Sequence, residues 1–196
     1  MFRIGIIVAL SCTASLATVA KAVPIEFIQT GSGSGTLDGI PFANSAFIIK
    51  SFGDTDNRVL FGSAFSINNG QSTFDIDGLG SLTLITGTRT FLDPNNGLVG
   101  YSLIDNEGPD LFDGPTNAAL ESWAMLDSIG LVTGTGRLLQ WSQSETGVSV
   151  QTDRGALFFN NGTPAATFQA VLLPEPSTLI LAALGGLALA AMRGRK

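Results

Sequence analysis

Two uncharged, apolar stretches lie near the ends of this 196-residue chain and confine any water-soluble domain to the residues between them. The first spans residues 4–20 and the second runs from Leu179 to Met192. They account for much of the positive mean hydropathy of +0.34. The middle has an ordinary soluble composition and is long enough for one domain with its own core.

The first 22 residues have the three parts of a secretory signal peptide. Arg3 supplies a short positive region, and Ile4 to Leu10 begin an apolar region that continues in small residues. Ala20 and Ala22 place small side chains at the two positions that a signal peptidase reads. The sequence therefore predicts a signal peptide over residues 1–22 and cleavage after Ala22.

Two other interpretations of this segment stay open. An uncleaved membrane anchor is disfavoured because the apolar run is short and interrupted by Ser11, Thr13 and Ser15. A lipoprotein cut before Cys12 is disfavoured because the preceding residues match the required pattern only loosely. Cys12 is the only cysteine, so a mature chain starting at Val23 has no disulfide and no thiolate site.

The C-terminal segment 174–196 combines a polar motif, an apolar run and a basic end. The motif is Pro174, Glu175, Pro176 and Ser177, and its prolines favour extended backbone. A helix over about 177–192 would be about 24 Å long, which is short for a bilayer core of about 30 Å. The run has no polar face, which disfavours an amphipathic or core helix. The membrane stop consists of Arg193, Arg195 and Lys196. These cations predict a cytoplasmic end and place the preceding domain outside the inner membrane.

This order of features resembles the PEP-CTERM sorting signal of Gram-negative bacteria, a tail also known as the ice-binding protein C-terminal domain. The resemblance rests on the motif 174–177, the apolar run and the basic end 193–196. It implies recognition by an exosortase, a membrane cysteine peptidase or transpeptidase, and cleavage near the motif. It also implies transient anchoring in the inner membrane, followed by delivery to the cell surface or the exopolysaccharide matrix of a biofilm.

The domain between the two signals, residues 23–173, is strongly acidic. It carries fifteen acidic and five basic residues, which gives a formal net charge of −10. Such a domain repels nucleic acids and bare anionic membranes. We therefore expect no nucleic-acid partner, whereas cations, basic surfaces and neutral polymers remain compatible with this charge.

Short β-prone runs alternate with Gly, Asn and Asp turns throughout this domain. The pattern predicts an all-β fold, a single β-sandwich or jelly-roll. Predicted strands are Ile25 to Gln29, Ser45 to Phe52, Val59 to Ile67, Ser81 to Thr86, Leu98 to Ile104, Trp123 to Asp127, Gly136 to Trp141, Val148 to Thr152, Ala156 to Asn160 and Ala166 to Leu172. Predicted turns are 54–57, 68–70, 77–78, 94–97 and 160–162. Residues 118–125 fit a short helix equally well.

The glycine-rich segment 31–39 does not have the spacing of a phosphate-binding loop, because no lysine follows at the required position. It is typical of a flexible crossing or an edge strand. Its form, together with the later segments 126–130 and 155–157, is similar to the domains of other PEP-CTERM proteins. This similarity implies a shared fold rather than an activity.

The chain contains no histidine, which excludes Ser-His-Asp catalysis, Cys-His catalysis and imidazole metal sites. Three carboxylate pairs have a spacing that a glycosidase could use, but we interpret them as residues of solvated loops. These pairs are Asp54 with Asp56, Asp75 with Asp77, and Asp105 with Glu107. We therefore predict no catalytic residues, no enzyme activity and no cofactor. Calcium is the one ion that the oxygen-rich turn 54–57 would suit, although no complete ligand loop is present.

Aromatic residues suggest two roles. The thirteen phenylalanines stand mainly in alternating runs, as core residues do. Trp123 and Trp141, with Tyr101, are candidates either for the core or for a platform on which sugars stack. We expect an exported, non-enzymatic surface or matrix protein, and the alternative is a lectin-like module that binds exopolysaccharide. Ice binding would need a regular threonine array, and Thr83, Thr86, Thr88 and Thr90 are too few and too unevenly spaced.

Overall fold

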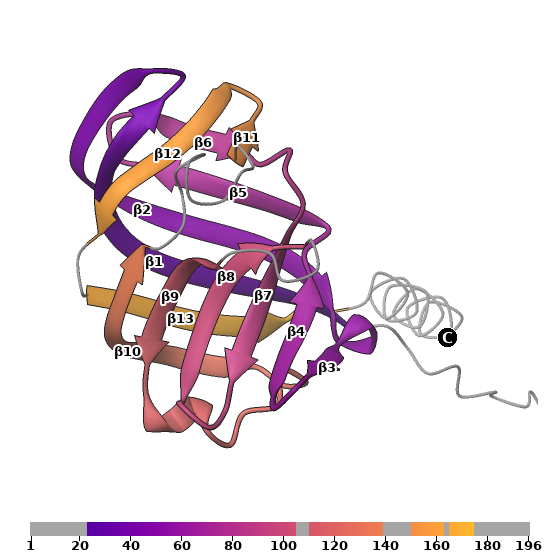
Figure 1. The fold of residues 1–196 in the computed structure, drawn as a ribbon. Coiled ribbons are helices and arrows are strands. Elements are labelled where there is room, and N and C mark those ends of the chain that lie inside the picture. Colours follow the sequence, from indigo (N-terminus) through magenta and orange to yellow (C-terminus); the bar gives the residue numbers. More distant parts are fainter. Residues whose placement is uncertain (1–22, 105–109, 139–149, 163–164, 175–196) are drawn as a thin grey trace, which may run out of the picture.

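The computed structural model describes residues 23–104, 110–138, 150–162 and 165–174. Within these ranges the regular elements are β-strands and two short 3-10 helices (Figure 1). The all-β prediction is confirmed. The strands are β1 (Pro24–Leu37), β2 (Ile40–Asp54), β3 (Val59–Phe61), β4 (Ala64–Asn68), β5 (Gln71–Ile76), β6 (Gly80–Thr83), β7 (Thr88–Asp93), β8 (Leu98–Leu103), β9 (Asp110–Thr116), β10 (Ile129–Leu138), β11 (Val150–Thr152), β12 (Gly155–Gly162) and β13 (Ala165–Leu172). The 3-10 helices are η1 (Thr55–Asn57) and η2 (Ala118–Leu120).

All these strands belong to one antiparallel sheet, in the order β3-β4-β7-β8-β9-β10-β13-β1-β2-β5-β6, with β11 and β12 paired beside β1. A β-sandwich has two separate sheets, whereas here one continuous sheet bends so that distant strands face each other (Figure 1). The ring of Phe47 in β2 lies 5.5 Å from the ring of Phe112 in β9, although three strands separate β2 from β9 in the sheet. The two facing layers that a sandwich builds from two sheets are here formed by one folded sheet.

One part of the sheet closes on itself. Strand β1 pairs with both β2 and β12, β2 pairs with β5, and β5 pairs with β6. An isolated bridge from Leu84 to Thr152 then joins the end of β6 to β11, which pairs with β12. The closed circuit leaves few free backbone groups at this end, which protects it from edge-to-edge association.

Two hydrophobic clusters fill the interior. The first surrounds the rings of Phe47, Phe74 and Phe159, which lie within 5.3 to 6.0 Å of one another. The second surrounds Phe27 and Phe168, both fully buried, and includes residues of β4, β7, β8 and β10. Burial of this apolar area is the main favourable contribution to folding, at about 25 cal/mol per Å².

The glycine-rich segment is a central strand, so its interpretation as a flexible crossing or edge strand is wrong. Strand β1 continues through it, and Gly33 pairs with Ser45 of β2 on one side and Gly162 of β12 on the other. The absence of side chains allows close packing on both sides. A Cβ atom at Gly31 would lie 2.7 Å from the Phe47 ring, and one at Gly35 would overlap the carbonyl oxygen of Phe158.

Two further local predictions are wrong. Residues 160–162 continue strand β12 instead of forming a hairpin turn, because Asn161 pairs with Ser34 and Gly162 with Gly33 of β1. Residues 123–127 form no strand and follow the short helix η2, so the helical alternative for 118–125 was closer. The turns at 77–78 and 94–97 do connect paired neighbouring strands, as expected.

The predicted signal peptide 1–22 and the helix over about 177–192 lie outside the described residues. Among the residues that the structure does describe, no helix is both long and apolar enough to cross a membrane.

Candidate functional site

The two ends of the folded domain lie side by side. Ile25 in β1 pairs with Leu172 in β13. The backbone N–H of Leu173 donates a hydrogen bond of 2.8 Å to the carbonyl oxygen of Pro24. The first and last strands are therefore neighbours, and the positions next to the two predicted processing sites lie at the same end of the domain.

No linker separates the sheet from the predicted sorting motif. Leu173 is still hydrogen-bonded to β1, and Pro174, which is exposed, is the first motif residue and the last of the described range. The other predicted members of these signals lie outside the described residues: Ala20, Ala22, Glu175, Pro176, Ser177, Arg193, Arg195 and Lys196. A peptidase that reads this motif would work within a few residues of a folded β-sheet.

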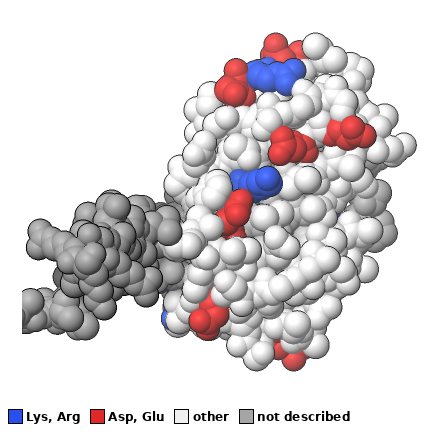
Figure 2. All heavy atoms as spheres, turned by 180° about the vertical axis from the view of Figure 1, so that it is seen from behind, with Lys and Arg blue, Asp and Glu red and all other residues white. Residues whose placement is uncertain are grey.

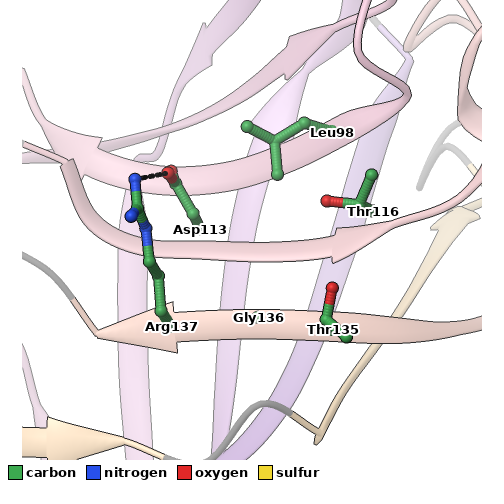
Figure 3. A pocket seen from close by; sticks show the side chains of 6 residues that line it. All are labelled: Leu98, Asp113, Thr116, Thr135, Gly136 and Arg137. Atoms are coloured by element: carbon green, nitrogen blue, oxygen red, sulfur yellow. Dashed lines mark ion pairs between the residues drawn. The ribbon is translucent and has the colours of Figure 1, made fainter.

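A second candidate site lies on the outer face of strands β8, β9 and β10 (Figure 3). It is a hollow of about 330 Å³ whose wall includes Leu98 of β8, Asp113 and Thr116 of β9, and Thr135 and Arg137 of β10. These residues are neighbours through the register of the sheet: Leu98 pairs with Thr116, Thr116 with Thr135, and Asp113 with Arg137.

A bulge in β9 brings two carboxylates to this face. In a regular strand, residues three apart point to opposite faces. Here Phe112 pairs with Tyr101 and Asp110 with Ser102, so Leu111 is an extra residue in β9. Leu111 and Phe112 both enter the core, which leaves Asp110 and Asp113 on the outer side.

The charges around this pair are balanced. Nη2 of Arg137 lies 3.9 Å from Oδ2 of Asp113, which is a loose ion pair in which the Arg137 side chain is 74% exposed. Arg89 of β7 donates a hydrogen bond of 2.8 Å from Nε to the Ser102 hydroxyl and acts electrostatically on Asp110. Two carboxylates thus face two guanidinium groups on a domain that is otherwise strongly acidic.

Both carboxyl groups have raised pKa values. The pKa of Asp113 is raised to about 6, mainly by burial and also by the charge of Asp110, while Arg137 opposes the shift. Burial also raises the pKa of Asp110, against the lowering effects of Arg89 and Arg137. Oδ1 of Asp113 is buried and accepts no hydrogen bond from the described residues. The carboxyl group of Asp113 is therefore incompletely satisfied by the protein itself.

An apolar hollow adjoins this polar one, and Leu98 lines both. It has a volume of about 240 Å³ and includes Phe61, Phe91, Arg89 and Asp110 in its wall. The Phe91 ring lies directly over Gly100, where a Cβ atom would overlap it. The lack of a side chain at Gly100 therefore lets the Phe91 ring pack against the sheet beside the charged residues.

The tryptophan platform does not form from the described residues. Trp123 is only 8% exposed, its ring lies 5.3 Å from that of Phe168, and its indole N–H donates a hydrogen bond to the carbonyl oxygen of Asp127. Tyr101 is fully buried, and its hydroxyl donates a hydrogen bond to Thr88. Trp141 lies outside the described residues. Trp123 and Tyr101 therefore pack in the core, and neither offers a ring face to a sugar.

The turn at 54–57 uses its acidic residues locally. Oδ1 of Asp54 accepts a hydrogen bond from the backbone N–H of Asp56 and caps the helix η1. Within the described ranges, no group of three or more His, Cys, Asp or Glu side chains lies close enough to hold a metal ion. The pair Asp105 and Glu107 lies outside those ranges. Figure 2 shows the molecule from behind relative to Figure 1, and on that face the acidic groups are spread over a largely uncharged surface.

Comparison with known proteins identifies one segment. Residues 173–196 match the family model described as the PEP-CTERM protein-sorting motif, which begins at the residue where the folded sheet ends. This match agrees with the resemblance found in the sequence, and the motif implies exosortase-dependent sorting of an exported protein. No curated protein and no solved structure matches the chain.

Proposed function

We propose that this chain is an exported, non-enzymatic protein of the cell surface or extracellular matrix that is processed through its C-terminal tail. The observation that carries the proposal is the sorting motif at residues 173–196, placed directly after the last strand of an acidic β-domain. The domain would be the cargo, and the tail would be the substrate of a membrane exosortase.

The position of the two domain ends supports the proposal that the domain is held and processed through its tail. Because Pro24 and Leu173 are hydrogen-bonded neighbours, both processing signals would leave the domain at one end. A chain held at that end by a membrane segment would present the rest of its sheet to the exterior. After both cuts, the remaining strands would keep their pairing, since β1 and β13 begin and end inside the predicted cleavage points.

The absence of histidine from the chain supports a non-enzymatic role, because the commonest general base is missing. The two carboxylates of the outer face each have an arginine nearby, which suits binding as well as it suits catalysis. An assay of the full chain against a panel of glycan substrates tests this part of the proposal, and measurable hydrolysis would contradict it.

Binding of exopolysaccharide is the second candidate role. It does not rest on Trp123, which is buried, but on the polar and apolar hollows that meet at Leu98. A cell-surface protein held in a matrix of sugar polymers would benefit from such a surface. Retention of the full chain by immobilised exopolysaccharide tests this role, and free passage would contradict it.

The test of the main proposal is the fate of the tail in the producing cell. We expect the mature protein to lack both end segments and to occur at the cell surface. Replacement of Pro174, Glu175 and Pro176 by alanine should leave the tail attached and the protein in the inner membrane.

A further inference from the structure

We propose that the hollow between β8, β9 and β10 is a binding site for a neutral, hydroxyl-rich ligand, a sugar unit of a polysaccharide, held by Asp113 and Arg137. This inference rests on the second proposed function, because it assigns the residues and the ligand class of that role.

The polar groups of the hollow have unused hydrogen-bonding capacity. The hydroxyls of Thr116 and Thr135, both exposed, make no side-chain hydrogen bond within the described part of the chain. Among the described residues, the side chain of Arg137 makes only the loose contact of 3.9 Å with Asp113, so within this part of the chain most of its five N–H donors are available. Four neighbouring side chains on two paired strands therefore present donors and acceptors to the same space (Figure 3).

The charges select against ions. An anion would be attracted by Arg137 but repelled by Asp110, by Asp113 and by the net charge of the domain. A simple cation would be attracted by the carboxylates but repelled by Arg89 and Arg137. A neutral ligand meets neither penalty and can use both signs of charge at once.

Adjacent hydroxyl groups match this pair of side chains. One hydroxyl can donate to the carboxylate of Asp113 while the oxygen of the next accepts from the guanidinium of Arg137. Hydrogen bonds to charged groups are the stronger class, and a fixed pair of them also sets the orientation of the ligand. The threonine hydroxyls, which both donate and accept, can contact further positions of the same ring.

The apolar side of the site fits the same ligand class. Sugar rings have apolar C–H faces, and binding sites commonly combine a few placed polar groups with apolar walls. Leu98 forms part of the polar hollow, and the adjoining hollow with Phe61 and Phe91 continues along the sheet. Two adjoining hollows that share Leu98 suit a polymer rather than an isolated monosaccharide.

The experiment measures binding of neutral glycans (dextran, mannan and cello-oligosaccharides) and of anionic alginate to the full chain in detergent. We expect one or more neutral glycans to bind and alginate to bind much more weakly. The variant Arg137→Met removes the donors, and Thr135→Val removes a hydroxyl while keeping its shape. Each should weaken binding, and Arg137→Met should do so about tenfold or more.

The control is Lys50→Met, which makes the same charge change in β2, separated from β10 by two strands of the sheet. It should bind like the wild type, and thermal unfolding should show that all variants are folded. If neutral glycans bind equally to wild type and Arg137→Met, the proposed location of the site is wrong, but the proposed role in polysaccharide binding stands. If no glycan binds, both are wrong, and the sorting function is unaffected. Preference for alginate would overturn the assignment to a neutral ligand.

Discussion

The backbone N–H of Leu173 donates a hydrogen bond to the carbonyl oxygen of Pro24, and this contact joins the residue that follows β13 to the first residue of β1. It means that the sorting motif starts where strand pairing stops. A cut on the amino-terminal side of Leu172 would remove part of β13 and unpair Ile25. A cut at or beyond Pro174 would leave the domain intact.

A flexible Gly/Ser linker inserted between Leu173 and Pro174 should therefore leave the stability of the domain unchanged. The mature protein should gain the mass of the insert, because the cut falls on its carboxyl side. Thermal unfolding and intact mass measure the two results. A mature protein without the insert would place the cut before Pro174 and contradict this account.

The buried hydroxyl of Thr88 links three polar side chains. It accepts hydrogen bonds from Tyr101 at 2.8 Å and from Asn69 at 3.2 Å, and it lies 3.1 Å from the Ser72 hydroxyl. Thr88→Val keeps the shape but leaves these groups without their shared partner, so we expect a loss of about 2–3 kcal/mol in the free energy of unfolding. Urea denaturation measures it. Thr73→Val is the control: Thr73 follows Ser72 in β5, so its side chain points to the other face of the sheet, and the change should alter stability little. Equal losses at Thr88 and Thr73 would argue against the network.

Gly35 in β1 lies against the backbone of β12. Gly35→Ala places a Cβ atom on the carbonyl oxygen of Phe158. Backbone must then move, and we expect a loss of more than about 2 kcal/mol in unfolding free energy. Gly130→Ala is the matched control, since a Cβ atom there has no neighbour within 4 Å. Similar stability of the two variants would show that the close approach is wrong.

The pH dependence of stability should reflect Asp113. Its pKa in the folded state is about 6, above the ordinary value of 3.8, mainly because of burial. The folded protein therefore binds more protons than the unfolded chain between these two values, so this group contributes stability that is lost as pH rises through about 6. Asp110, whose pKa is also raised, acts in the same direction, whereas Arg89 and Arg137 oppose the shifts.

Asp113→Asn should flatten this dependence and make the protein more stable than wild type at pH 7 and above. Urea denaturation across pH 4 to 8 measures the effect. Asp127→Asn, at an exposed position outside the sheet, serves as a control and should leave the profile unchanged. A wild-type stability that rises steadily through this range would contradict the raised pKa.

The sequence predicted the fold class well because alternation and turn residues are local signals. Strands with apolar alternation, such as Leu98–Leu103, were placed almost to the residue. Strands β5, β7 and β9 were missed, since Gln71–Ile76, Thr88–Asp93 and Asp110–Thr116 are rich in polar and turn-forming residues. Their strand structure depends on pairing with neighbours that are distant in the sequence.

The site was less accessible to prediction. Asp110 and Asp113 are three residues apart, a spacing that places side chains on opposite faces of a regular strand, and only the bulge at Leu111 brings them together. Arg137 joins them through strand pairing across the sheet. Conversely, Trp123 was a candidate for sugar binding because its residue type suits that role, but its burial depends on tertiary packing against Phe168.

The central claim is that the tail directs sorting and processing of an exported β-domain. The most direct test compares intact mass and cell fractionation of the native protein with those of a variant in which Pro174, Glu175 and Pro176 are alanine. We predict a wild-type protein that starts near Val23, lacks the tail and reaches the cell surface, and a variant that keeps the tail in the inner membrane. If wild type and variant both retain the tail, the domain is a membrane-anchored periplasmic protein and the sorting account is wrong.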